Sequence, residues 1–244
     1  PITKFTKQIT NPDSIKYYLD KAFYESTNCR PGPIYLEIPL DIQSAKVNIK
    51  KYKSFFQKKV KEKKLNLQLI KKYLNKSSRP IILLGNGINV AHQSIKIKQI
   101  IKKLKIPTLT TQLGKAAMEY ENNFFIGHPG PKGDRAGNLA VQNSDFILIL
   151  GSSLPSQTIG WEHDKFSPNS FKIQIDPDKS ILKKNKFINL KINSDLKFAI
   201  KDLKKIVLKK NFTEWHKKCL KWKKKYQIIF FLPTHTIFFT ILVN

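Results

Sequence analysis

The sequence predicts a doubly wound α/β fold around a parallel sheet of six strands, preceded by the final helix and strand of a second α/β domain. Two observations predict this fold class. Short, continuously apolar runs alternate with segments whose apolar residues recur at helical spacing, which is typical of a parallel sheet covered by helices on both faces. Several of these runs also end in glycine, which tight turns from strand to helix favour.

Residues 1–43 carry one predicted helix and one predicted strand. Asn11 can cap the helix and Pro12 suits its first position, after which apolar residues follow at helical spacing. A turn at 30–33 leads into a short apolar strand at 34–38. One helix and one strand are too few for a domain, so we expect this segment to be the end of a domain that begins upstream of the sequence.

The segment 44–64 is rich in lysine and has no clear period, so it is predicted to be a linker. A regular alternation of strands and helices then fills residues 65–208, and its arrangement is Rossmann-like. The strands are predicted at 81–84, 108–111, 124–126, 146–150, 171–175 and 187–192. Helices are predicted around Leu67–Leu74, Ile97–Leu104 and Leu196–Val207.

The last segment, 209–244, is basic as far as Tyr226 and strongly apolar from Gln227 onward. A membrane-spanning helix needs roughly 20 apolar residues, whereas a proline and a histidine interrupt this shorter run. Three interpretations stay open: a membrane anchor behind a lysine cluster, the start of a further domain, or sequence that is truncated or out of frame. The third is preferred, and no functional membrane contact is expected.

The formal net charge is +28, and lysine supplies nearly all of the positive charge, since the arginines are Arg30, Arg79 and Arg135. Arginine is the residue that makes bidentate contacts to phosphates and base edges. The lysines are scattered along the chain, so we expect a solvated surface and no specific nucleic-acid partner. Cys29 and Cys219 form no metal or disulfide pattern, and a cytoplasmic location is expected.

Two stretches resemble a known family. In RPGPIYLEIPLDIQ, residues 30–43, a Pro-Gly-Pro turn, an apolar strand and an Ile-Pro-Leu-Asp exit occur together, as at the end of the pyrimidine-binding domain of thiamine-diphosphate enzymes. GHPGPKGDRAGNLAVQNSDFILILGSSL, residues 127–154, is similar to the middle of the central domain of acetolactate synthase large subunits. The shorter stretches LLGNG, TTQLGKAAM and KIQIDPD follow the family's order. The resemblance covers about residues 1–210.

The resemblance implies a parent enzyme that depends on thiamine diphosphate and magnesium, decarboxylates a 2-keto acid such as pyruvate, and forms a homo-oligomer. In the family, the activating glutamate lies in the first domain, and a Gly-Asp-Gly motif followed by asparagine holds the metal in the third. This chain has no Gly-Asp-Gly, and Glu25 and Glu37 belong to the closing helix and strand.

No catalytic or metal-binding residue is therefore expected in this chain, and its histidines form no triad or metal set. We expect a fragment of the parent that is inactive alone. The alternative is a stand-alone nucleotide-binding or regulatory α/β module without thiamine chemistry.

The glycine turns also suggest a nucleotide site, because the central domain binds a dinucleotide, often FAD, in several relatives of the family. Open α/β sheets bind ligands at the carboxyl ends of their strands, where glycines let phosphates approach backbone N–H groups. The cofactor-binding candidates are Gly85, Gly87, Gly114, Gly133, Asp134, Arg135, Gly151 and Asp176. Alternatively, the glycines only form tight turns, and Asp134 and Arg135 pair with each other. Ser153 stands where relatives commonly have arginine, which disfavours FAD.

Overall fold

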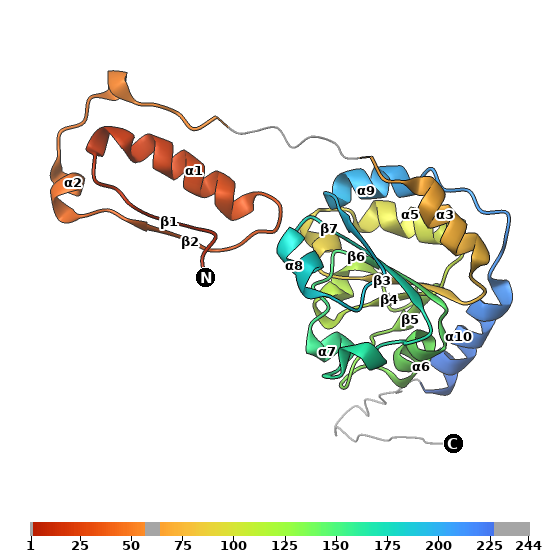
Figure 1. Ribbon diagram of the computed structural model, residues 1–244. Helices are drawn as coiled ribbons and strands as arrows, with labels where there is room; N and C mark the ends of the chain where they lie inside the picture. The colour runs from red at the N-terminus through yellow and green to blue at the C-terminus, as the bar shows by residue number, and fades with distance from the viewer. Residues whose placement is uncertain (1, 57–63, 227–244) are drawn as a thin grey trace, which may run out of the picture. The chain divides into compact units, whose positions relative to one another are not determined.

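The computed structural model describes residues 2–56 and 64–226, which belong to two compact units, residues 1–62 and 63–244 (Figure 1). The predicted apolar tail from residue 227 lies outside the described residues. A six-stranded parallel sheet is present, as the sequence predicts, and a small two-stranded parallel sheet precedes it.

The first unit consists of a two-stranded parallel sheet and one long helix. β1 (Phe5–Gln8) pairs with β2 (Ile34–Glu37), and α1 (Ile15–Thr27) lies between them in the chain. The sequence predicts α1 and β2 but not β1, because only Phe5 in this strand is a large apolar residue. The shorter elements are η1 (Pro12–Ser14), α2 (Leu40–Ser44) and η2 (Ile49–Lys51).

Residues 44–56, the first part of the predicted linker, pack against α1. The Phe55 ring centroid lies 5.6 Å from that of Tyr17 and 5.3 Å from that of Tyr24. The backbone N–H of Asn48 donates to Asp13 Oδ1 over 3.2 Å. Aromatic and polar contacts thus attach this lysine-rich segment to the first unit.

The second unit contains a parallel sheet in the order β5-β4-β3-β6-β7-β8, which confirms the doubly wound fold class. The first strand of the unit therefore lies in the middle of the sheet, beside the fourth, and the strand order reverses between them. The strands are β3 (Pro80–Leu84), β4 (Thr108–Thr110), β5 (Phe125–Gly127), β6 (Phe146–Leu150), β7 (Phe171–Asp176) and β8 (Leu190–Asn193).

Helices cover both faces of this sheet, which explains why its central strands are continuously apolar (Figure 1). The helices are α3 (Leu67–Lys76), α4 (Gly87–Val90), α5 (Ser94–Leu104), η3 (Gln112–Ala117), α6 (Arg135–Asn143), α7 (Ser156–Ile159), η4 (His163–Lys165), α8 (Lys179–Lys184), α9 (Leu196–Leu203) and α10 (Thr213–Lys225). In β3, Ile82 and Leu84 pack into one core with α3, α5 and α9, and Ile81 and Leu83 pack into a second core with α6 and α10.

The sequence pattern does not predict helix α10, because lysines dominate its composition. Trp215 and Cys219, four residues apart on one helix face, are buried in the second core. Nε1 of Trp215 donates to the carbonyl of Pro80 over 3.0 Å. Among the described residues, every helix is too short or too polar to cross a membrane.

Candidate nucleotide site

Four of the candidate glycines lie together where the strand order reverses. Gly85 and Gly87 follow β3, and Gly151 follows its neighbour β6. Ligands of open α/β sheets bind at such a switch point. Gly114, in η3 after β4, adjoins the same place, since a Cβ atom added to it would lie 2.7 Å from the carbonyl oxygen of Leu84.

The turns after β3 and β6 touch backbone to backbone. A Cβ atom at Gly85 would lie 2.1 Å from the carbonyl oxygen of Gly151, and one at Gly87 would lie 2.8 Å from the Cα atom of Gly151. Gly151 itself has a φ angle of +61°, a left-handed conformation that favours glycine. Close packing of the two turns therefore requires glycine at these positions.

The backbone N–H groups of all five candidate glycines are used inside the protein. They donate to carbonyl oxygens over 2.8–3.0 Å: Gly85 to Leu150, Gly87 to Gly151, Gly114 to Thr111, Gly133 to Gly130, and Gly151 to Ile175. A phosphate cradle needs N–H groups that point at the ligand. These glycines do not provide such groups, and the geometry favours their role in packing.

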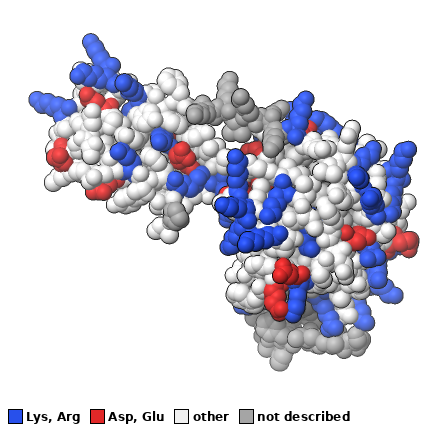
Figure 2. Space-filling model, viewed as in Figure 1, with Lys and Arg blue, Asp and Glu red and all other residues white. Residues whose placement is uncertain are grey.

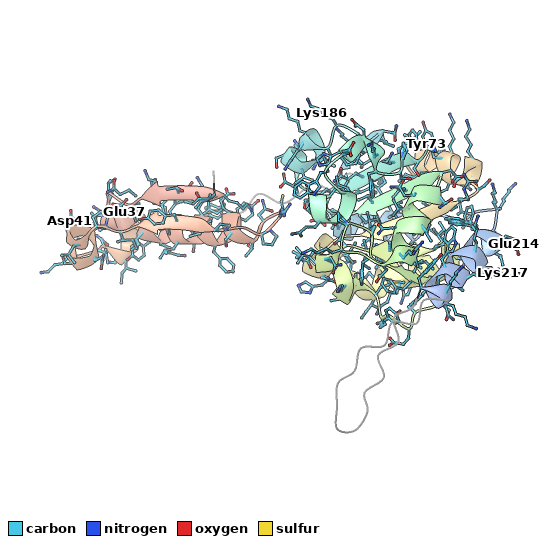
Figure 3. All side chains as sticks on the ribbon, turned by 90° about the horizontal axis from the view of Figure 1, so that it is seen from below. Glu37, Asp41, Tyr73, Lys186, Glu214 and Lys217 are labelled. Carbon is cyan, nitrogen blue, oxygen red and sulfur yellow. The ribbon has the colours of Figure 1, made fainter. Side chains whose placement is uncertain are left out.

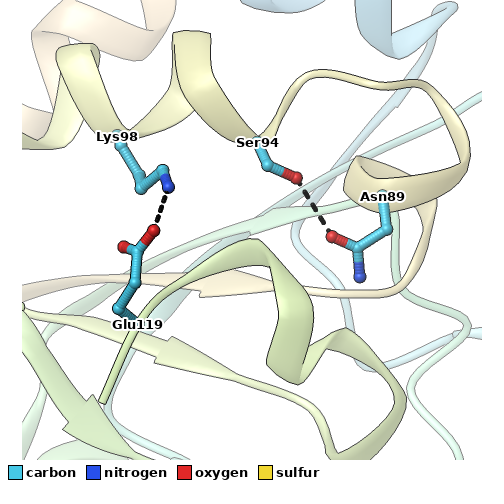
Figure 4. A network of polar contacts seen from close by, with 4 residues as sticks. All are labelled: Asn89, Ser94, Lys98 and Glu119. Atoms are coloured by element: carbon cyan, nitrogen blue, oxygen red, sulfur yellow. Dashed lines mark hydrogen bonds and ion pairs between the residues drawn. The ribbon is translucent and has the colours of Figure 1, made fainter. Parts of the chain in front are cut away.

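Two side-chain contacts hold the segments around α5 (Figure 4). Ser94 Oγ, at the start of α5, donates to Asn89 Oδ1 in the segment after β3 over 3.1 Å, and Lys98 connects α5 to the segment beyond η3 through an ion pair with Glu119. Just before α5, the buried Oε1 of Gln93 has no hydrogen-bond partner. This oxygen can only accept a hydrogen bond, so it does not fit an anionic phosphate.

Asp134 and Arg135 have separate partners at the start of α6. Asp134 Oδ2 accepts a hydrogen bond of 2.7 Å from the backbone N–H of His128 and so closes its own loop. The guanidinium carbon of Arg135 lies 4.7 Å from the centroid of the Tyr226 ring, just past the end of α10. The structure therefore accounts for both charges without a ligand.

Asp176, the last residue of β7, lies at the same edge of the sheet and is buried. Its Oδ1 accepts from the backbone N–H of Asp178 over 2.9 Å, and its carbonyl accepts from the Ser194 N–H over 3.3 Å. These bonds close the turn after β7 and connect it to the end of β8.

His128 is a titratable side chain at this edge that sequence spacing did not single out. Its Nδ1 lies 2.8 Å from Thr110 Oγ1 and 3.0 Å from the Thr110 carbonyl. Burial lowers the pKa of His128, so the imidazole is mainly neutral at pH 7. Only the pairing of β4 with β5 brings these two residues together, and nothing in the sequence indicates their contact.

The residues that the structure describes contain no group of three His, Cys, Asp or Glu side chains able to hold a metal ion. Magnesium is bound through carboxylates together with phosphate and water oxygens.

The strand order and the glycine turns at its reversal define a doubly wound, Rossmann-like α/β domain. Residues 67–203 match the family model for the central domain of thiamine pyrophosphate enzymes. The chain belongs to the thiamine pyrophosphate enzyme family.

Curated relatives with similar sequences are acetolactate synthase large subunits. The protein of Cyanidium caldarium is 28% identical over 93% of this chain, and the probable acetolactate synthase large subunit of Methanocaldococcus jannaschii is 30% identical over 83%. The isozyme 1 large subunit of Escherichia coli is 25% identical over 88% of the chain. The matches cover 41%, 35% and 38% of these relatives, so the chain spans about two fifths of their length.

Proposed function

We propose that this chain is part of a thiamine-diphosphate-dependent enzyme of the acetolactate synthase type, which decarboxylates a 2-keto acid and transfers the resulting acyl unit. The carrying observation is the match to acetolactate synthase large subunits over 83% to 93% of the chain, through both units. Pyruvate is the proposed substrate, with magnesium as a further cofactor, a homo-oligomeric assembly and a cytoplasmic location.

Thiamine diphosphate, when bound, supplies the carbanion chemistry of such enzymes. We assign no chemical step to the described residues. Their proposed contribution is architectural: the central sheet and its covering helices form a scaffold on which the other domains of the parent are held.

A stand-alone nucleotide-binding module is less well supported. The glycine N–H groups at the switch point donate inside the protein, and Arg135 lies against Tyr226. FAD would have to bind through other groups at the carboxyl edge of the sheet.

Acetolactate formation tests the proposal in two steps. The purified 244-residue chain, supplied with pyruvate, thiamine diphosphate and magnesium, should form no acetolactate. A longer chain, extended from the flanking genomic sequence to include a Gly-Asp-Gly motif followed by asparagine, should form acetolactate only when both cofactors are present. The proposed function would be contradicted if no reading frame in the flanking genomic sequence encodes this motif, or if the extended chain does not use pyruvate. Turnover by the 244-residue chain would contradict its expected inactivity.

A further inference from the structure

β5 (Phe125–Gly127) is an edge strand, since the sheet ends with it. An edge strand presents backbone N–H and C=O groups that can pair with a strand of another molecule. The sequence around β5, Phe124-Phe125-Ile126, is apolar and uncharged, and such a segment at an open edge promotes association. This edge therefore needs protection in the folded chain.

Helix α10 places hydrogen-bond donors on the carbonyls of this edge. Lys223 Nζ donates to the carbonyl of Phe125 over 2.8 Å and to that of Tyr120 over 2.6 Å. The His216 Nε2 atom lies 2.7 Å from the carbonyl of Asn123, which can only accept, so Nε2 is the donor. Two side chains of one helix thus occupy carbonyls that lie in β5 or just before it.

The same two side chains also cover the aromatic residues at the edge. The His216 ring stacks on Phe124, with 4.7 Å between centroids and 24° between planes. Lys223 Nζ lies 5.1 Å from the Phe125 ring centroid and 4.5 Å from that of Tyr120. His216 and Lys223 therefore combine hydrogen bonds and ring contacts at the same edge of the sheet.

Helix packing alone does not explain Lys223. Its side chain is half-buried, and burial lowers its pKa, because an ammonium group is costly to remove from water. A purely apolar side chain would pack on these rings at lower cost. Other lysines of α10 avoid this cost, as Lys217 does in its exposed ion pair with Glu214 on the outer side of the helix (Figure 3).

We infer that α10 guards the β5 edge against a second copy of this chain, with Lys223 and His216 as the residues that block pairing. Two copies present the same edge, so unguarded β5 strands can pair with each other around a twofold axis. The protection of β5 by α10 does not depend on thiamine chemistry or on the proposed function.

The test compares full 244-residue chains by sedimentation velocity over a range of concentrations. Lys223→Met removes the ammonium but keeps an unbranched side chain, and His216→Phe keeps the stacked ring but removes the donor. Lys221→Met is the matched control, since Lys221 is exposed on the same helix. Lys223→Met and His216→Phe should each self-associate with a dissociation constant about tenfold lower than that of the control. A factor of about ten corresponds to the loss of one hydrogen bond from a charged or polar donor.

Amide hydrogen exchange identifies the surface that associates. The associated variants should gain protection at residues 125–127, and Lys223→Arg, which retains donors, should behave like the control. The inference is overturned if Lys223→Met and His216→Phe both associate as weakly as Lys221→Met, or if the protection from exchange arises away from β5. If the circular dichroism signal shows that Lys223→Met is unfolded, the other two variants decide the outcome. His216→Phe should then associate more tightly than Lys221→Met, and Lys223→Arg should not.

Discussion

At the scale of single residues, Gly85 shows how closely the central turns pack. The position of its absent side chain is filled by the backbone of Gly151. Overpacking at a backbone contact cannot be relieved by a change of rotamer, so the two turns would have to move apart. Their hydrogen bond from Gly87 to Gly151 would then be strained.

Gly85→Ala is expected to lower the free energy of unfolding by about 3 kcal/mol because of this overlap. Gly160→Ala is the control: its φ angle of +82° is unfavourable for alanine, but no atom lies within 4 Å of an added Cβ. We expect it to cost about 1 kcal/mol. Urea unfolding measures the free energy of unfolding of both variants. Equal decreases would show that the close contact between the two turns does not determine the effect of Gly85→Ala.

Asp145 connects the amino ends of β3 and β6, at the edge opposite the candidate site. Its carboxylate accepts from Ser77 Oγ, from the Ser78 N–H over 2.8 Å and from the Arg79 N–H over 2.9 Å. Burial alone would raise the pKa of Asp145, but these hydrogen bonds outweigh it and hold the pKa below 3.8. The ionised carboxylate therefore stabilises the folded chain.

Asp145→Asn should lower the free energy of unfolding by about 2 kcal/mol at pH 7, because the hydrogen bonds to a charged acceptor are lost. The folded pKa is below the unfolded value of 3.8, so this stabilisation is complete above pH 3.8 and is lost as the pH falls through the folded pKa. Urea unfolding at pH 7, 5 and 3 should show the gap between variant and unaltered chain narrowing only at pH 3. If the difference in free energy of unfolding is the same at all three pH values, the ionised carboxylate of Asp145 is not its source.

At the scale of elements, α10 shows that a basic helix can belong to a core. Trp215 is 5% exposed and Cys219 is fully buried, while the lysines occupy the remaining surface of the helix. Burial strongly raises the pKa of the Cys219 thiol, so this cysteine behaves as a small apolar residue. A narrow apolar stripe thus anchors α10 in the second core, beside the polar contacts that His216 and Lys223 make with the sheet edge.

Trp215→Ala should lower the free energy of unfolding of the central domain by about 3–4 kcal/mol, because it leaves a cavity and an unsatisfied Pro80 carbonyl. Trp161→Ala removes the same side chain from a position that is 84% exposed and should change this free energy by less than about 0.5 kcal/mol. Thermal or urea unfolding of the full chains makes the comparison. Similar effects for both variants would mean that α10 does not stabilise the domain.

At the scale of the whole molecule, the charge distribution is the main feature. Lysine and arginine side chains are spread over both units on the face that Figure 2 shows, with acidic residues at fewer places. Scattered lysines attract polyanions through charge alone, and this attraction falls steeply with salt.

Binding to DNA or RNA is therefore expected to be weak and independent of sequence. At physiological salt, fluorescence anisotropy with several labelled oligonucleotides should give dissociation constants above about 10⁻⁶ M, the range of non-specific binding. Raising the salt should weaken binding to all of them alike. Submicromolar affinity for one particular sequence would contradict this prediction.

The sequence by itself determined the fold class of the central domain. A strand such as Ile81–Leu84 is apolar at every position because helices cover both faces, and that pattern is local enough to be recognised without contacts. The family motifs in residues 127–154 are equally local. β1 and α10 were missed because a half-polar strand and a lysine-rich helix carry weak local signals.

Only the tertiary structure decided the contacts of the candidate site residues. Sequence placed Gly85 and Gly151 at strand ends, but the pairing of β3 with β6 brought their backbones into contact and directed their N–H groups to carbonyls of the protein. Asp134, Arg135 and His128 likewise have partners that spacing does not reveal. A glycine turn has the same sequence whether its N–H groups face a phosphate or a neighbouring strand, because that choice depends on residues far away in the chain.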